Sequence, residues 1–114
     1  MKKASSFIVI NAISIYLVSL LMDNMYIGSF KSLLILTLIF GILNLTVKPI
    51  IKFFSLPITF LTLGLFSLVI NGAVLKLAFS IVSGVHLSGF ISAIIASILL
   101  SIANMILYSV LGDD

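Results

Sequence analysis

The stretch NLTVKPIIKFFSLPITFLTLGLF, residues 44–66, decides the fold, because it places two lysines and two prolines between long apolar runs. The chain around it has 114 residues, of which 62% are hydrophobic and 8% are charged, and its mean hydropathy is +1.45. Soluble domains usually carry about 25% charged residues. So few charges cannot coat a water-soluble globule. The composition therefore predicts a membrane protein.

Four apolar runs divide the chain, at about residues 4–22, 30–47, 58–80 and 90–111. Each is close to the roughly 20 residues that a helix needs to cross the hydrocarbon core. The runs are continuously apolar and do not alternate with period two, which favours helices over a barrel. No small-x-small cleavage site follows the first run, so we expect it to be retained. The predicted fold class is all-α, an integral membrane four-helix bundle forming a single domain over residues 1–114.

The lysines predict the orientation of the chain in the membrane. Lys2 and Lys3 precede the first run, and Lys48 and Lys52 lie between the second and third runs. If all four runs cross the membrane, these lysines share one side, while the other side has Lys31 and a lysine late in the third run. Lysines concentrate on the cytoplasmic side of membrane proteins. We therefore expect a multi-pass protein of the cytoplasmic membrane with both termini in the cytoplasm.

The Lys-Pro segment predicts a short connector over residues 48–57. Lys48 and Lys52 are four residues apart and would share one face of a short helix, with apolar residues covering the rest. Pro49 suits the first turn of such a helix, and Pro57 is placed to end it and start the third span. We interpret the segment as an amphipathic connector at the cytoplasmic interface. An ordinary loop with stop-transfer lysines is the alternative.

A shift of 60 residues superimposes one half of the sequence on the other. VINAISIYL, which begins at Val9, lies over VINGAVLKL, which begins at Val69. The same register matches Asn11 with Asn71, Phe30 with Phe90, Ser32 with Ser92, and Asn44 with Asn104. The match predicts two helical hairpins of the same orientation, over about residues 4–47 and 58–111, as a parallel repeat.

The repeat predicts that its four asparagines, Asn11, Asn44, Asn71 and Asn104, lie at similar depth in the membrane. A side-chain amide facing lipid would cost several kcal/mol, on the order of the desolvation of an unpaired polar group, so each should face another helix. Two polar stripes with the same spacing support this: Thr37, Gly41, Asn44 and Lys48, then Ser97, Ser101, Asn104 and Tyr108. The asparagines either bond helix to helix or line a polar cavity or water path in an oligomer.

Several function classes lack the residues that they need. The sequence has no cysteine, no glutamate and no paired carboxylates within a span, so we expect no enzyme, no catalytic residue, no metal site and no cofactor. The scattered lysines do not indicate nucleic acid binding, and no small-molecule substrate is evident. The expected partners are the lipid bilayer and either further copies of the chain or other membrane proteins.

The central block resembles the four-span phage holins of superfamily IV, also called YvlD-like proteins, a family of small bacterial membrane proteins. The matching residues are Asn44, Lys48, Pro49, Pro57, Thr59, Thr62 to Phe66 with Gly64, Asn71, Gly84, Gly89 and Phe90. Ser83 departs from the family, which often has proline there, and so does DNM in the first outer loop, where Pro-Gly is usual. The departures affect the expected loop conformation and not the membership.

The resemblance implies a protein of the bacterial cytoplasmic membrane and supplies no catalytic residue. Holins form oligomeric holes in that membrane, whereas most members of this family look like chromosomal proteins, some of them tied to envelope stress. Two functional hypotheses follow. The first is a structural or envelope-maintenance role through helix packing and partners. The alternative is a holin-like oligomeric pore former that permeabilises the cytoplasmic membrane.

Overall fold

The structure, a computed structural model, describes residues 2–111, with side chains from Ser5 onward. Five helices and two short strands make up these residues. In chain order they are α1 (Lys2–Leu21), β1 (Met25–Ile27), α2 (Phe30–Phe54), α3 (Leu56–Leu61), α4 (Phe66–Ile81), β2 (Val85–Leu87) and α5 (Phe90–Leu111). The expectation of a mostly helical chain is therefore confirmed, but the two strands were not predicted.

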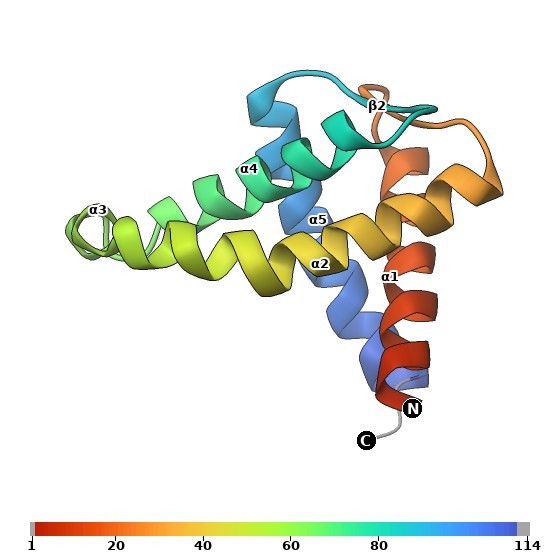
Figure 1. Cartoon of the computed structure of the whole chain (residues 1–114), viewed down its shortest axis with the longest axis horizontal. Helices are drawn as coiled ribbons and strands as arrows, with labels where there is room; N and C mark the ends of the chain where they lie inside the picture. The colour runs from red at the N-terminus through yellow and green to blue at the C-terminus, as the bar shows by residue number, and fades with distance from the viewer. Residues whose placement is uncertain (1, 112–114) are drawn as a thin grey trace.

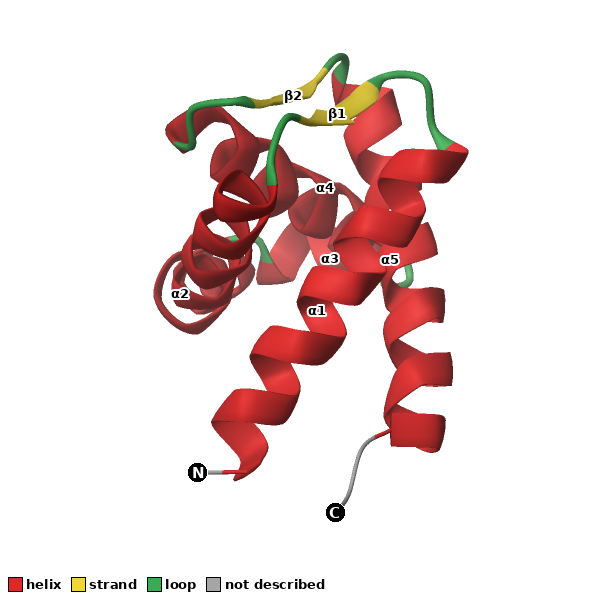
Figure 2. Ribbon diagram, turned by 90° about the vertical axis from the view of Figure 1, so that its right-hand side faces the viewer, coloured by secondary structure: helices red, strands yellow, loops and turns green. Residues whose placement is uncertain are grey.

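The helices form two arms that diverge from the strands (Figure 1). Helices α1 and α5 lie side by side and lead to the two chain ends (Figure 2), and we call this pair the terminal arm. Helices α2 and α4 form the central arm, with α3 at its far tip. The arms cross near the strands, where α1 packs on α2 and α4 packs on α5. Each long helix therefore packs against two others. Helices that follow each other in the chain, α1 with α2 and α4 with α5, cross each other where the arms meet.

The Lys-Pro segment is not the separate connector that the sequence predicts. Helix α2 continues through Lys48, Pro49 and Lys52 to Phe54. Pro49 removes one helical hydrogen bond, whereas ending the helix there would leave several carbonyls without partners in an apolar environment. The expected boundary at residue 48 is therefore wrong, and the helix tolerates its proline.

The predicted start of the third span at residue 58 is also too early. Pro57 lies in the first turn of the short helix α3, and a turn over residues 62–65 separates α3 from α4. Leu63 and Gly64 both have positive φ there, of 57° and 90°. This backbone conformation suits glycine and interrupts the helical path, so α4 begins only at Phe66.

The loop between α1 and α2 pairs with the loop between α4 and α5 as an antiparallel two-stranded sheet, and we call residues 22–29 and 82–89 the outer loops. Tyr26 faces His86 at its centre, Met25 pairs with Leu87, and Ile27 pairs with Val85. Two flanking backbone bonds, from the Gly28 amide to Gly84 (2.8 Å) and from the Ser88 amide to Asn24 (3.0 Å), correspond to each other at the 60-residue offset. Residues 31–40 and 91–100 also follow the same order of buried and exposed positions. The halves therefore share their local structure.

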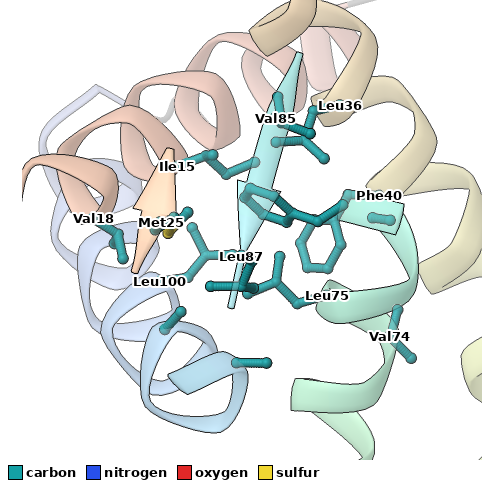
Figure 3. Packing of buried hydrophobic residues seen from close by; sticks show 14 of the residues in the cluster. Ile15, Val18, Met25, Leu36, Phe40, Val74, Leu75, Val85, Leu87 and Leu100 are labelled. Atoms are coloured by element: carbon teal, nitrogen blue, oxygen red, sulfur yellow. The ribbon is translucent and has the colours of Figure 1, made fainter. Parts of the chain in front are cut away.

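The core lies where the arms cross, beneath the strands (Figure 3). Ile15, Leu36 and Leu75 come from three different helices and are completely buried. Val85 and Leu87 of β2 project from the strand into the same cluster. Small residues bring the helices close together: a Cβ at Gly72 of α4 would stand 2.9 Å from the Ile94 Cα of α5.

The outer surface is apolar on every long helix. Leu21, Leu45 and Met105 are 73%, 81% and 65% exposed, respectively. Phe30–Phe54 and Phe90–Leu111 are long and apolar enough to cross a membrane, and Ser5–Leu21 and Phe66–Ile81 are shorter apolar helices. Exposure on this scale is unusual for a soluble monomer and is typical of surfaces that contact lipid or other proteins.

Candidate functional site

A polar cavity of about 210 Å³ lies among the four long helices. Its lining residues are Phe7 and Asn11 of α1, Phe40, Asn44 and Lys48 of α2, Asn71 of α4, and Ser97, Leu100, Ser101, Asn104 and Tyr108 of α5. Asn11, Asn44, Asn71 and Asn104 thus meet in one place, each on a different helix. We call this site the polar cavity.

The periodicity of the α-helix, 3.6 residues per turn, explains why these side chains converge. On α2, Phe40, Asn44 and Lys48 recur every four residues and so lie along one face of the helix. On α5, Ser97, Ser101 and Asn104 follow the same kind of spacing. The two sequence stripes therefore both contribute to the cavity, although Thr37 is fully buried and Gly41 packs against Phe7.

The two asparagine side chains of the terminal arm form hydrogen bonds within that arm. The Asn104 Nδ2 donates a hydrogen bond of 3.1 Å to the Asn11 Oδ1, which links α5 to α1. The Asn11 Nδ2 in turn donates to the Phe7 carbonyl at 2.9 Å, and Asn11 is only 3% exposed. Such bonds contribute about 0.6 kcal/mol on average between membrane helices, and about 1–2 kcal/mol in model peptides.

The central arm leaves the corresponding amides unpaired. The Oδ1 atoms of Asn44 and Asn71 are buried and accept no hydrogen bond from the described part of the chain. The Asn104 Oδ1 is in the same state, although its Nδ2 is bonded. A buried acceptor without a donor is costly, by about 1–3 kcal/mol, so such groups usually meet water or a ligand. The cavity therefore presents three acceptors to whatever fills it.

Lys48 gives the cavity its charge. It is half-buried and lines the cavity, whereas Lys52, one turn further along α2, is exposed. The described lining residues include no acidic side chain. At the 60-residue offset Lys48 corresponds to Tyr108, which lines the cavity from the terminal arm. The site therefore combines one cation with neutral hydroxyl and amide groups.

The remaining motif residues lie at the tip of the central arm and do not line the polar cavity. The Thr62 Oγ1 accepts a hydrogen bond of 3.1 Å from the Phe66 amide, the first amide of α4. The Gly64 amide donates to the Thr59 carbonyl at 2.8 Å, and its φ of 90° favours glycine. Thr62, Gly64 and Pro57 thus shape the α3–α4 turn, and Pro49 and Lys52 lie in the last turns of α2.

Sequence reasoning missed the aromatic walls of the cavity. Phe7 and Phe40 form these walls, and nothing distinguishes them in sequence from the other phenylalanines of the chain. Lys48 was assigned both to the polar stripe with Asn44 and to an interfacial connector. The uninterrupted helix α2 carries it to the cavity beside Asn44, as its place in the stripe indicates.

Further polar contacts lie outside the cavity. The Lys76 Nζ donates to the Leu87 carbonyl of β2, so this lysine of α4 is fixed to the outer sheet. His86 is exposed and stacks on Tyr26, with ring centroids 6.0 Å apart. Among residues 2–111, no group of three or more His, Cys, Asp or Glu side chains could hold a metal ion.

The sequence matches a known family over most of its length. The model of the Mycobacterial 4 TMS phage holin, superfamily IV, matches residues 4–106. The chain belongs to this family. The uncharacterized membrane protein YvlD of Bacillus subtilis is 37% identical over 101 residues, which cover 88% of this chain and 85% of the relative.

A second relative comes from a different bacterium. The uncharacterized protein SCO3922 of Streptomyces coelicolor is 35% identical over 86 residues, which cover 72% of this chain and 69% of the relative. No solved structure matches the chain. The family and the apolar helices together place the protein in a membrane.

Proposed function

We propose that this holin-family protein crosses the bacterial cytoplasmic membrane four times and acts there as a structural or envelope-maintenance component through helix packing and partners. Its four long helices are apolar, and each exposes large apolar side chains. Lys2 and Lys3 lie in the first turn of α1, and Lys48 and Lys52 lie in the last two turns of α2, which favours cytoplasmic termini. The proposed role requires no catalytic group.

The observation that carries the proposal is the packed core that joins the two arms. The arms cross over a packed core, and strands β1 and β2 cover that core on the outer side. The polar cavity is small, about 210 Å³, and side chains of all four long helices line it. One copy therefore supports a folded membrane scaffold better than an open channel.

The runner-up is a holin-like oligomeric pore. It is favoured by the convergence of the four asparagines and by the family to which the chain belongs. In such an assembly the arms of several copies would separate and turn their polar stripes toward a shared water path. The alternative thus requires rearrangement of the terminal arm, in which Asn11 and Asn104 are already bonded to each other.

Induced expression separates the two functions. We expect normal growth, an intact membrane potential and no entry of a membrane-impermeant dye at high expression. Timed leakage that disappears in Asn104→Leu would establish the pore function instead. Asn24→Leu is the matched control, because it makes the same substitution at an exposed outer-loop position. Protein levels in the membrane fraction must be equal for all three chains.

The topology is tested by single cysteines, since the chain has none of its own. We expect His86→Cys in β2 to react with a membrane-impermeant maleimide in intact cells. Leu63→Cys, in the turn of the central arm, should react only after permeabilisation. Both positions are exposed, and Leu63 is 93% exposed. The reverse pattern would contradict the proposed orientation.

A further inference from the structure

The polar cavity contains an uncompensated positive charge and buried hydrogen-bond acceptors, and water can pair with both but cannot neutralise the charge. Lys48 brings a positive charge into a cavity without acidic lining residues, and Asn44, Asn71 and Asn104 bring buried amide oxygens without donors. A half-buried ammonium gains most from a fixed anion, through a charge-assisted hydrogen bond. The amide oxygens accept only from donors such as hydroxyl groups. One ligand that meets both needs is an anion that also carries hydroxyl groups.

We propose that the polar cavity binds a glycerol phosphate group, with the phosphate at Lys48 and the glycerol hydroxyls at the amide oxygens of the central arm. This chemistry occurs in the headgroups of anionic phospholipids and in free glycerol phosphate. The inference rests on the proposed function in one respect, because a lipid reaches Lys48 only if the end of α2 lies at the bilayer interface.

The lining residues fit the two parts of such a group. The phosphate oxygens accept from the Lys48 ammonium, and the hydroxyls of Ser101 and Tyr108 face the same cavity from α5. The glycerol hydroxyls donate to the Oδ1 atoms of Asn44 and Asn71, which lack donors among the described residues. The exposed Lys52 adds positive potential one turn away on α2.

The dimensions and surroundings also favour a headgroup. A volume of about 210 Å³ is below the roughly 300–1,000 Å³ that is typical of pockets for drug-sized molecules. Phe40 and Leu100 supply apolar walls next to the polar groups. Leu45 and Met105, which directly follow Asn44 and Asn104, are 81% and 65% exposed. Acyl chains of a bound lipid can therefore lie along the outside of α2 and α5.

Binding is tested on the purified full chain in nanodiscs of phosphatidylcholine, with phosphatidylglycerol as the probe. We expect phosphatidylglycerol to bind and to raise the Tm by about 4 °C or more, whereas added phosphatidylcholine does not. Lys48→Met should weaken phosphatidylglycerol binding about ten-fold, the effect of losing one charge-assisted bond. Lys52→Met, the matched control on the exposed turn, should change it less than about two-fold. Equal losses in both variants would show general attraction to a basic surface and overturn the proposal.

Further arms of the experiment identify the source of the group and guard against misfolding. Free glycerol phosphate added to the detergent-solubilised chain should raise the Tm if the natural ligand is soluble, and inorganic phosphate should do so less. A rise with phosphatidylglycerol alone identifies the lipid. If Lys48→Met does not fold in phosphatidylcholine, Asn71→Leu replaces it, and unchanged phosphatidylglycerol binding in that variant overturns the proposal. Because the readout is binding, its failure is independent of the permeability result.

Discussion

The terminal and central arms are built from equivalent sequence positions but treat their asparagines differently. In the terminal arm, Asn104 donates to Asn11 and so links α5 to α1. In the central arm, Asn44 and Asn71 occupy the equivalent positions, and their amide oxygens accept nothing from the described residues. The terminal arm joins its two amides to each other and leaves only the Asn104 Oδ1 without a donor, whereas the central arm leaves both of its amide oxygens available at the polar cavity. A repeated polar residue therefore does not have a repeated role.

The arms also differ in the polar residue that follows the asparagine at the cavity, which is Lys48 in α2 and Tyr108 in α5. Lys48 of α2 stands where the repeat places Tyr108 in α5, and α2 is longer than α5 by three residues. A tyrosine can donate or accept a hydrogen bond within the fold, whereas a lysine in the cavity requires an anion or water. The central arm thus carries two of the three unpaired amide oxygens of the cavity together with the uncompensated cation. This combination is what a ligand site needs and what a purely structural amide pair lacks.

The largest expected effect concerns the crossing that joins the arms. At Gly72 of α4, an added Cβ would stand 2.7 Å from the Ile94 Cγ1 and 2.9 Å from its Cα. Gly72→Ala should therefore push α4 away from α5 and destabilise the chain by about 1–3 kcal/mol, as overpacking does. Unfolding by denaturant in phosphatidylcholine bicelles measures the change.

Gly41→Ala is the control for this substitution. Its added Cβ would meet the ring of Phe7 at 2.9 Å, which is a side chain and not backbone. The ring can shift, so we expect a smaller loss of stability than for Gly72→Ala. A loss at Gly41 equal to or greater than that at Gly72 would show that the α4–α5 contact is not the tighter crossing.

The second prediction compares the amides of the two arms directly. Asn104→Leu removes the donor to the Asn11 Oδ1, which is buried and would be left unpaired, so we expect a loss of about 1–2 kcal/mol. Asn44→Leu removes a group whose oxygen already lacks a donor, and should change stability by about 0.5 kcal/mol or less. The same denaturant unfolding, in lipid without phosphatidylglycerol, compares the variants. Equal losses would contradict the assigned difference between the arms.

Sequence patterns predicted the local structure well where it depends on apolar length. The fourth apolar run, residues 90–111, has the bounds of α5, and the second begins at Phe30 as α2 does. The 60-residue offset also holds for the outer strands, from Met25–Ile27 to Val85–Leu87. These features follow from helix length in lipid and from loop composition, and both depend only on residues that are close together in the sequence.

The features that sequence patterns missed depend on tertiary contacts. Pro49 predicted a helix start, but α2 passes through it because a break would expose more carbonyls than the proline itself does. The strands are three residues long and are stabilised by pairing with each other, so neither carries a periodic signal. Equivalent asparagines gave no indication of which pair bonds, because that depends on sub-ångström placement of the helices.

The smallest expected effects concern the outer loops, where the two halves exchange side-chain hydrogen bonds. The Ser32 Oγ donates to the Ser83 carbonyl at 3.1 Å, and the Asn24 Nδ2 donates to the Ser92 Oγ at 2.9 Å. Ser32→Ala and Ser92→Ala should each cost about 0.5–1 kcal/mol, because neutral bonds near water contribute little. Ser92→Ala should be the milder, since the Asn24 Nδ2 also bonds to the Ser88 carbonyl at 3.5 Å, whereas Ser32→Ala also removes the acceptor of the Ser29 Oγ.

Hydrogen exchange of the Gly28 and Ser88 amides measures this local effect, because both amides bond across the loops. We expect faster exchange at these amides and little change at core positions such as Leu36 and Leu75. If either serine variant destabilised the whole chain more than Asn104→Leu, the outer loops and not the amide pair would hold the terminal arm in place. The stability of the terminal arm would then come from the loops and not from the bond between Asn104 and Asn11. The different pairing of the asparagines in the two arms would not account for a difference in their stability.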